Sequence, residues 1–181
     1  MTTDKGILQV SYIVGNIYRN KKLMSQYLTL RSAGRAEVLK INRFEAERVR
    51  LRRMTDRGTD LAIMTNDGTK MSHGDVLVAT NKRFIIVQQE PEHVMTVRMR
   101  AIRPISKLIS VSAIIGHIIG NMHRPISTEY KGKHIVFPLL SDSEYLLFER
   151  LFSKVLDCVE LKVEHVVFLS NQGADIHEHR V

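Results

Sequence analysis

Hydrophobic and polar positions alternate in short runs over the first half of the chain, which predicts strands joined by tight turns. Asp56-Arg57-Gly58 between two runs is typical of a hairpin turn, because glycine readily adopts a positive φ. Tyr18–Ala36 is polar, basic and weakly patterned, and we interpret it as an irregular excursion. Residues 1–90 are therefore expected to form an all-β domain, with strands over Ile7–Val14, Glu37–Ile41, Arg50–Thr55, Thr59–Thr65, Val76–Ala79 and Phe84–Gln88.

After Pro91 the pattern predicts strands alternating with helices. The apolar positions of Ser106–Asn121 follow a helical period, and Ser141 followed by Glu144 is typical of a capping box that opens a second helix. The predicted strands are Val94–Met99, a hairpin of Ile126–Tyr130 and His134–Pro138, and Val159–Phe168. The order β-α-β-β-α-β predicts a ferredoxin-like domain over residues 91–170, followed by a flexible tail over 171–181. The overall class is α+β.

The helix predicted over Ser106–Asn121 has an uncharged surface. From Leu108 to His123 the sequence has no Asp, Glu, Lys or Arg, yet polar residues interrupt the run too often for a bilayer-spanning segment of about 20 apolar residues. A helix that is apolar on two faces needs cover on both, and its own sheet covers only one. We therefore expect a homodimer through this helix, around Ile114 and Ile118, with the helix ending at Gly120 and Asn121.

Composition and charge narrow the class of partner. The single cysteine, Cys158, excludes an intramolecular disulfide and a cysteine-rich zinc site, and we expect a buried structural thiol. The N-terminus has no signal-peptide pattern, so a cytoplasmic protein is expected. The formal net charge is +8, of which residues 1–90 carry +7 and residues 91–181 carry +1, whereas seven of the eight histidines follow residue 90. The basic excess thus belongs to the first domain.

Candidate chemistry is confined to the histidines. The sequence has no nucleophile elbow, phosphate-binding loop, dinucleotide fingerprint or zincin pair, so we assign no catalytic residue and expect no enzyme. A neutral imidazole is a good ligand for Ni²⁺, Cu²⁺ or Zn²⁺. His123 follows the predicted dimer helix, where a two-fold axis would bring two copies together, and His177 and His179 form a His-x-His pair on the tail. We interpret His117 as a packed residue, and His134 and His165 as structural or surface residues.

Two ordered motifs carry a family resemblance. The first runs over Arg43–Thr59 and continues with Asp67-Gly68 and His73-Gly-Asp-Val-Leu77. The second, His117-Ile-Ile-Gly-Asn-Met-His-Arg-Pro125, is similar to a signature of an aliphatic residue followed by Gly-Asn-Arg-His. From about Glu37 to Phe168 the chain resembles the urease accessory protein UreE family.

The resemblance implies a nickel metallochaperone that delivers Ni²⁺ for assembly of the urease active site. It implies a β-rich, peptide- or partner-binding first domain and a ferredoxin-like second domain that dimerises and binds metal. Nickel would be held at the dimer interface by His123 of both protomers, with help from His177 and His179. The implied partners are the urease apoprotein complex and its GTPase accessory protein, and no association with a membrane is expected. Zn²⁺ or Cu²⁺ would also bind in vitro.

This sequence departs from the family pattern at several positions. Met122 replaces the arginine of the signature, although Arg124 could partly substitute for its charge. Extra histidines that some members carry before the second helix are absent from Phe137–Asp142. Tyr18–Ala36 is an insertion relative to compact members, and the sequence assigns it no function.

Two other functions remain open at this point. A ferredoxin-like RNA-binding protein would agree with the basic isoelectric point, but residues 131–138 match an RNA-binding strand poorly and the basic excess lies in the other domain. A non-metal adaptor of a urease-type complex could use Arg43–Arg57, with six arginines against three acidic residues, to dock an acidic surface. The same arginines also fit a solvated strand pair.

Overall fold

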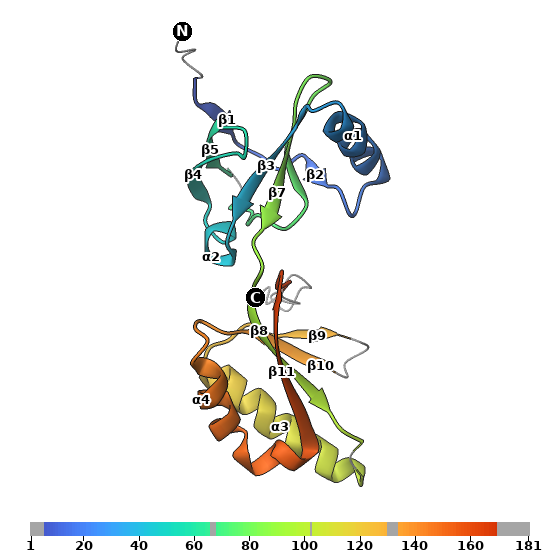
Figure 1. The fold of residues 1–181 in the computed structure, drawn as a ribbon, viewed down its shortest axis with the longest axis vertical. Coiled ribbons are helices and arrows are strands. Elements are labelled where there is room, and N and C mark those ends of the chain that lie inside the picture. Colours follow the sequence, from blue (N-terminus) through green and yellow to red (C-terminus); the bar gives the residue numbers. More distant parts are fainter. Residues whose placement is uncertain (1–5, 66–67, 102, 130–133, 170–181) are drawn as a thin grey trace, which may run out of the picture. The chain divides into compact units, whose positions relative to one another are not determined.

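The computed structural model describes residues 6–65, 68–101, 103–129 and 134–169. Two compact units divide the chain, Met1–Glu90 and Pro91–Val181, and each is described by itself (Figure 1). Both contain helices and sheets, so the predicted α+β class is confirmed. None of the helices in the described part of the chain is long and apolar enough to cross a membrane.

The first unit contains two sheets. In one, β5 (Asp60–Met64) lies between β1 (Leu8–Val10), which is parallel to it, and β4 (Arg50–Met54), which is antiparallel. The other has the order β2 (Gly15–Asn16), β6 (Asp75–Ala79), β7 (Phe84–Gln89) and β3 (Ala36–Ile41), with β3 parallel to β7. The predicted turn between β4 and β5 forms as expected, with Gly58 at φ 75°. Apolar side chains from both sheets share one core, which includes Leu39, Ile41, Leu61, Ile63, Ile85 and Val87.

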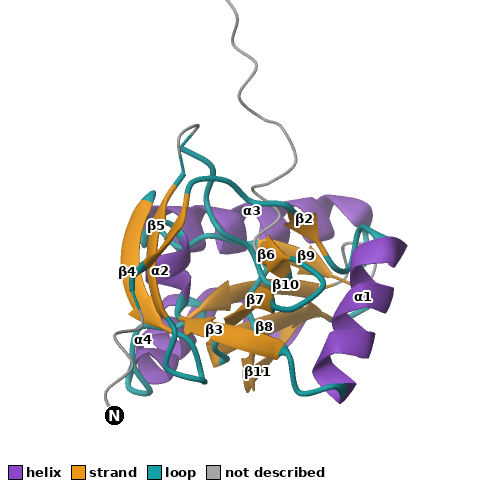
Figure 2. Ribbon diagram, turned by 90° about the horizontal axis from the view of Figure 1, so that it is seen from above, coloured by secondary structure: helices purple, strands orange, loops and turns teal. Residues whose placement is uncertain are grey.

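Helix α1 (Lys21–Ser32) occupies the segment that we expected to be irregular, so the prediction of an all-β first domain is wrong. The Asn20 side chain caps the helix by accepting from the backbone N–H groups of Lys22 and Leu23. Its buried residues are Leu23, Tyr27 and Leu30, which pack on the second sheet (Figure 2). Three apolar positions on one stripe are enough to pack the helix on the sheet. They are too few to give a clear helical pattern in an otherwise polar sequence.

The second unit has the order β-α-β-β-α-β, with all strand pairs antiparallel in the sheet order β11-β8-β10-β9. Its elements are β8 (Glu92–Met99), α3 (Ile105–Asn121), β9 (Ser127–Glu129), β10 (His134–Pro138), α4 (Glu144–Leu151), the 3-10 helix η1 (Ser153–Cys158) and β11 (Val159–Val166). Both helices lie on one face of the sheet (Figure 1).

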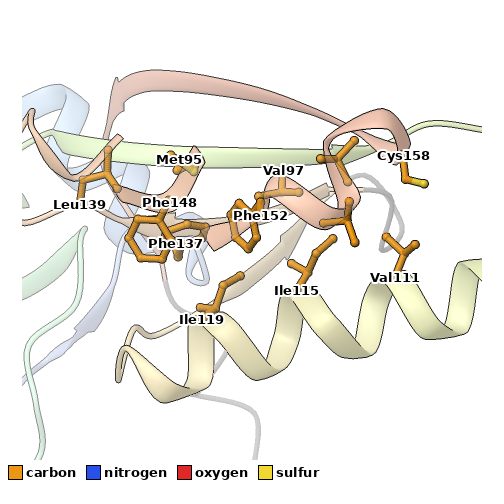
Figure 3. Close-up of a cluster of buried hydrophobic side chains, with 12 residues drawn as sticks. Met95, Val97, Val111, Ile115, Ile119, Phe137, Leu139, Phe148, Phe152 and Cys158 are labelled. Atoms are coloured by element: carbon orange, nitrogen blue, oxygen red, sulfur yellow. The ribbon is translucent and has the colours of Figure 1, made fainter. Parts of the chain in front are cut away.

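The core of the second unit fills the space between that sheet face and the two helices. Val111, Ile115 and Ile119 of α3 point into it (Figure 3). An aromatic cluster lies opposite, in which the rings of Phe137 and Phe148 are 4.6 Å apart. Cys158 is buried at the end of η1, as expected. The stripe that faces the sheet is therefore fully occupied, and the remaining faces of α3 are left to solvent or to another protein.

Candidate metal centre

His123 follows the C-cap residue of α3, in a backbone conformation that is uncommon for residues other than glycine. Met122 is the C-cap residue, and His123 has φ 52° in the left-handed region. The His123 N–H donates to the Gly120 carbonyl and the Arg124 N–H to the Ile119 carbonyl, which together form a Schellman motif. Glycine usually occupies this position, because a Cβ atom there costs roughly 1–2 kcal/mol. The helix thus runs past Gly120, and its left-handed residue is a histidine.

The His123 side chain is exposed, so its imidazole is accessible to an incoming ion. His117 is also exposed on α3, and its Nε2 lies 3.0 Å from Asn121 Nδ2, which corrects our interpretation of His117 as a packed residue. Within the described residues no three His, Cys, Asp or Glu side chains form a group that could hold a metal ion. His177 and His179 lie outside the described residues. Ligands for an ion at His123 must then come from a second protomer, from the tail or from water.

Arg124 does not take the role that the sequence suggested for it, which was to supply the charge lost at Met122. Its guanidinium is 11% exposed and pairs with Glu144 at 2.5 Å, and the other Glu144 oxygen accepts from the Leu140 N–H. Arg124 is therefore committed to tying the end of α3 to the start of α4, and it does not replace the charge lost at Met122. The same contacts show that the predicted capping box is wrong: Ser143, not Ser141, precedes α4, and tertiary partners occupy the Glu144 carboxylate.

Helix α3 exposes large apolar side chains on the surface that its own sheet leaves uncovered. Ile105, Ile109 and Ile114 are 73%, 64% and 39% exposed, whereas Ile115 is completely buried. Ile118, which we expected at the dimer contact, is partly buried against the unit's own core. The exposed leucines of α4, Leu146, Leu147 and Leu151, add to the apolar surface of this unit. Ile105 and Ile109 lie on one side of α3 and Ile114 on the other, about 180° from Ile105 at 3.6 residues per turn. Exposed apolar side chains in such numbers are a reason to look for an interaction site on this unit.

A second histidine cluster lies on the sheet of the same unit. His93 and His165 are directly opposite each other in the β8–β11 register, with ring centroids 4.9 Å apart. Asp142 Oδ1 is 2.5 Å from His93 Nδ1. His165 is exposed, in agreement with its interpretation as a structural or surface residue, and no sequence motif marks His93. Only the strand register, which the sequence does not give, brings these two residues together.

In the first unit, His73 has both ring nitrogens engaged. Its Nδ1 accepts from the Gln89 N–H at 3.2 Å, and its Nε2 lies 3.1 Å from the Tyr18 hydroxyl. The Tyr18 and His73 rings stack with their planes 10° apart. Burial lowers the pKa of His73, which favours the neutral ring. These contacts fix the loop before β6 and leave no ring nitrogen for a metal ion.

The basic segment Arg43–Arg57 is largely paired within the unit. Arg52 binds Asp60 at 2.7 Å, and Arg53 binds Glu45 at 3.2 Å. Arg57 donates to the Gly34 carbonyl instead, beside a cavity of about 520 Å³ between α1 and the strands β3 and β7. That cavity is lined by apolar side chains, by the cations of Arg31 and Arg57 and by the single carboxylate of Asp56; the apolar part of the lining includes Met24, Tyr27, Val38 and Ile86.

Comparison with known proteins agrees with the architecture. Residues 19–89 match the family model of the UreE urease accessory protein, N-terminal domain, a range that includes most of Tyr18–Ala36. The urease accessory protein UreE 1 of Pseudomonas syringae pv. tomato is 32% identical over 130 residues, which cover 71% of this chain and 81% of that protein. The urease accessory protein UreE of Natronomonas pharaonis is 31% identical over 133 residues, which cover 74% of this chain but 60% of that protein.

These likenesses define an accessory protein of urease maturation and not an enzyme. The chain belongs to the urease accessory protein UreE family.

Proposed function

We propose that this chain is a homodimeric, cytoplasmic nickel carrier that delivers Ni²⁺ for assembly of the urease active site. His123 of each protomer binds the ion at the dimer interface, and His177 and His179 add ligands from the tail. The second unit acts as a ferredoxin-like metal-binding and dimerisation domain. The GTPase accessory protein of urease and the urease apoprotein complex receive the metal.

The observation that carries this proposal is the position of His123. An exposed imidazole occupies a left-handed position that would suit glycine better, and residues held in such conformations cluster at functional sites. Imidazole nitrogen suits Ni²⁺, and one histidine from each protomer leaves coordination positions open. A carrier needs such an incomplete shell, because its ion must pass to the next protein.

The exposed isoleucines of α3 support a dimer that would bring two His123 residues together. Ile114 lies about two turns before Asn121, the last residue of α3, and is the exposed isoleucine nearest in the helix to His123, whereas Ile105 and Ile109 lie in its first turns. Burying them against a second copy removes apolar area from water, at about 25 cal/mol per Å². A two-fold axis near the end of α3 then makes the metal site and the dimer contact parts of one interface.

Calorimetric titration of the full chain with Ni²⁺ tests the site. We expect tight binding at one ion per dimer, loss of that site in H123G, and an unchanged dimer mass by light scattering. H134A is the matched control, because His134 lies on β10 in register with Arg98 and Glu129. The assignment of His123 is wrong if H123G binds Ni²⁺ as tightly as the parent protein. The double variant H177A/H179A should lower the affinity or change the stoichiometry while the dimer persists.

The first unit has features that suit partner docking. The cavity between α1 and the strands β3 and β7 offers apolar contacts next to Arg31 and Arg57, which suits a peptide with apolar and acidic side chains.

Pull-down of urease components with and without Ni²⁺ separates a carrier from an adaptor. A carrier should show capture that depends on nickel, whereas an adaptor should capture the same proteins in its absence.

A further inference from the structure

The pair of histidines on β8 and β11 has the arrangement of a metal-binding site. His93 and His165 face each other in an antiparallel register, where Cβ atoms are about 4.5–5.5 Å apart. Their rings already touch edge to face at 4.9 Å between centroids. The His165 side chain is exposed, so its ring has room to turn toward an ion beside His93.

Asp142 prepares His93 for this role. An ionised carboxylate only accepts hydrogen bonds, so the proton of a neutral His93 ring must lie on Nδ1, which is 2.5 Å from Asp142 Oδ1. The lone pair of the ring is then on Nε2, where a metal ion can take it. A carboxylate behind a ligating histidine is a common outer-shell arrangement that fixes the tautomer and orients the ring.

The pair also lies at the same end of the second unit as His123. The Arg124–Glu144 ion pair ties the residue after His123 to the first residue of α4. Asp142 is two positions before that residue and contacts His93, while the Leu139 N–H donates to the His93 carbonyl. The end of α3, the start of α4, the start of β8 and the end of β11 therefore meet around these side chains.

We propose that His93 and His165 form a second binding site for a divalent cation that prefers nitrogen ligands, such as Ni²⁺, Cu²⁺ or Zn²⁺, with Asp142 orienting His93. In the described part of the chain no group of three candidate ligands forms, so the protein supplies two nitrogens and water completes the shell. His93 is 44% exposed at its side chain, which leaves room for that water. Such a site binds more weakly than a closed one and exchanges its ion readily. It needs neither His123 nor the tail.

The test uses the full chain with every other proposed ligand removed. In the background H123A/H177A/H179A, calorimetry with Ni²⁺ should find one weak site per protomer. Adding H165A or H93A should weaken it at least tenfold, and adding D142A should weaken it by about tenfold, as loss of an outer-shell partner does. Adding H134A, a change on the same sheet, should have no effect. Cu²⁺ bound to the background should show an electron paramagnetic resonance spectrum with two nitrogen ligands, and only one after H165A.

Each outcome decides the proposal separately from the role of His123. Retention of the weak site in both H93A and H165A overturns it, as does a background protein that binds no Ni²⁺ at all. A cooperative unfolding transition in each variant shows that the fold persists, so lost binding reports on the ligands. Failure of H123G to affect the tight site would contradict the proposed function and leave this pair untouched.

Discussion

At the scale of single residues, His123 combines an unfavourable backbone with an accessible imidazole. Its φ of 52° lies where an L-residue with a Cβ atom is strained and glycine is not. The hydrogen bonds from the His123 and Arg124 N–H groups hold that conformation in place. Backbone strain that the surrounding structure maintains in this way is concentrated at functional sites.

We predict that H123G stabilises the fold in the absence of metal. Glycine relieves strain of roughly 1–2 kcal/mol and loses part of this through the greater freedom of its unfolded chain, which leaves a gain of up to about 1 kcal/mol. Urea unfolding should show a higher midpoint at unchanged slope. H123A keeps the Cβ atom and should show no gain, so equal midpoints for the two variants would contradict the strain argument.

His73 gives the first unit a dependence on pH. Because burial lowers the pKa of His73, the unfolded chain binds a proton in a pH range where the folded ring stays neutral. Stability is therefore fully present above the unfolded value of about 6.5 and falls as the pH drops below it. Protonation of Nδ1 would also break the bond that it accepts from the Gln89 N–H.

Replacing His73 with glutamine should flatten this dependence. The amide oxygen of H73Q can still accept from the Gln89 N–H but has no proton to gain, so its melting temperature should change less between pH 7 and pH 5. Asp75, whose pKa burial raises, contributes with the opposite sign in acid, but it is present in both proteins. Parallel melting curves for H73Q and the parent protein over this range would contradict the role of His73.

At the scale of elements, α3 separates two functions on two faces. Ile115 is completely buried against the unit's own sheet, whereas Ile109 is 64% exposed one and a half turns earlier. The inward face holds the unit together, and the outward face is free to hold a second copy. A substitution on each face should therefore have a different consequence.

We predict that I109E yields a monomer with nearly normal stability, because a charge in the apolar contact between two copies is costly while the side chain leaves the internal core intact. I115A should instead lower the free energy of unfolding by about 2–5 kcal/mol through the cavity that it leaves. Sedimentation equilibrium and urea unfolding measure the two effects. A dimer that survives I109E would place the contact elsewhere.

Local signals explain which elements could be predicted. The β4–β5 hairpin follows from Asp56-Arg57-Gly58 alone, because the turn and its flanking strands are adjacent in the chain. Helix α1 was missed because only Leu23, Tyr27 and Leu30 mark its buried face. Its one clear signal was Asn20 as a helix cap. The spacing of Ser141 and Glu144 gave a wrong prediction of a capping box. The Glu144 carboxylate accepts instead from the Arg124 guanidinium and from the Leu140 N–H.

At the scale of the whole molecule, each unit has its own core. The sheets of the first unit enclose Leu39 and Ile85, whereas α3, α4 and the sheet of the second enclose Ile115 and Phe148. Every proposed metal ligand belongs to the second unit or to its tail. The basic charge, by contrast, belongs to the first.

We predict that a fragment spanning Pro91–Val181 keeps the tight Ni²⁺ site and the dimer, since it carries both the ligands and the exposed face of α3. A fragment spanning Met1–Glu90 should bind no Ni²⁺, because the nitrogens of its one histidine, His73, are engaged. Calorimetry on both fragments makes the measurement. If the Pro91–Val181 fragment folds but does not bind Ni²⁺ tightly, the first unit must supply ligands to the site.

The candidate sites differ in how far the sequence reveals them. His123 could be found because its neighbours form a contiguous motif at the end of a run, Leu108–His123, that has no charged residue. The His93–His165 pair could not, because its members are brought together only by the pairing of the first and last strands of the unit. The end of α3 at Asn121 agrees with the prediction, but the left-handed conformation at His123 was hidden, since glycine and not histidine usually marks that position.

The strained conformation at His123 has an evolutionary consequence. For most binding residues, replacement costs the protein either nothing or some stability, so a lost site leaves no thermodynamic trace. Here the fold itself favours replacement by glycine, because glycine adopts the left-handed conformation more easily than a residue with a Cβ atom. Random substitution would drift toward glycine wherever the proposed metal ligand was not needed. A change to glycine would remove the proposed ligand without a loss of stability, so the proposed function ties the imidazole at this position to continuing selection.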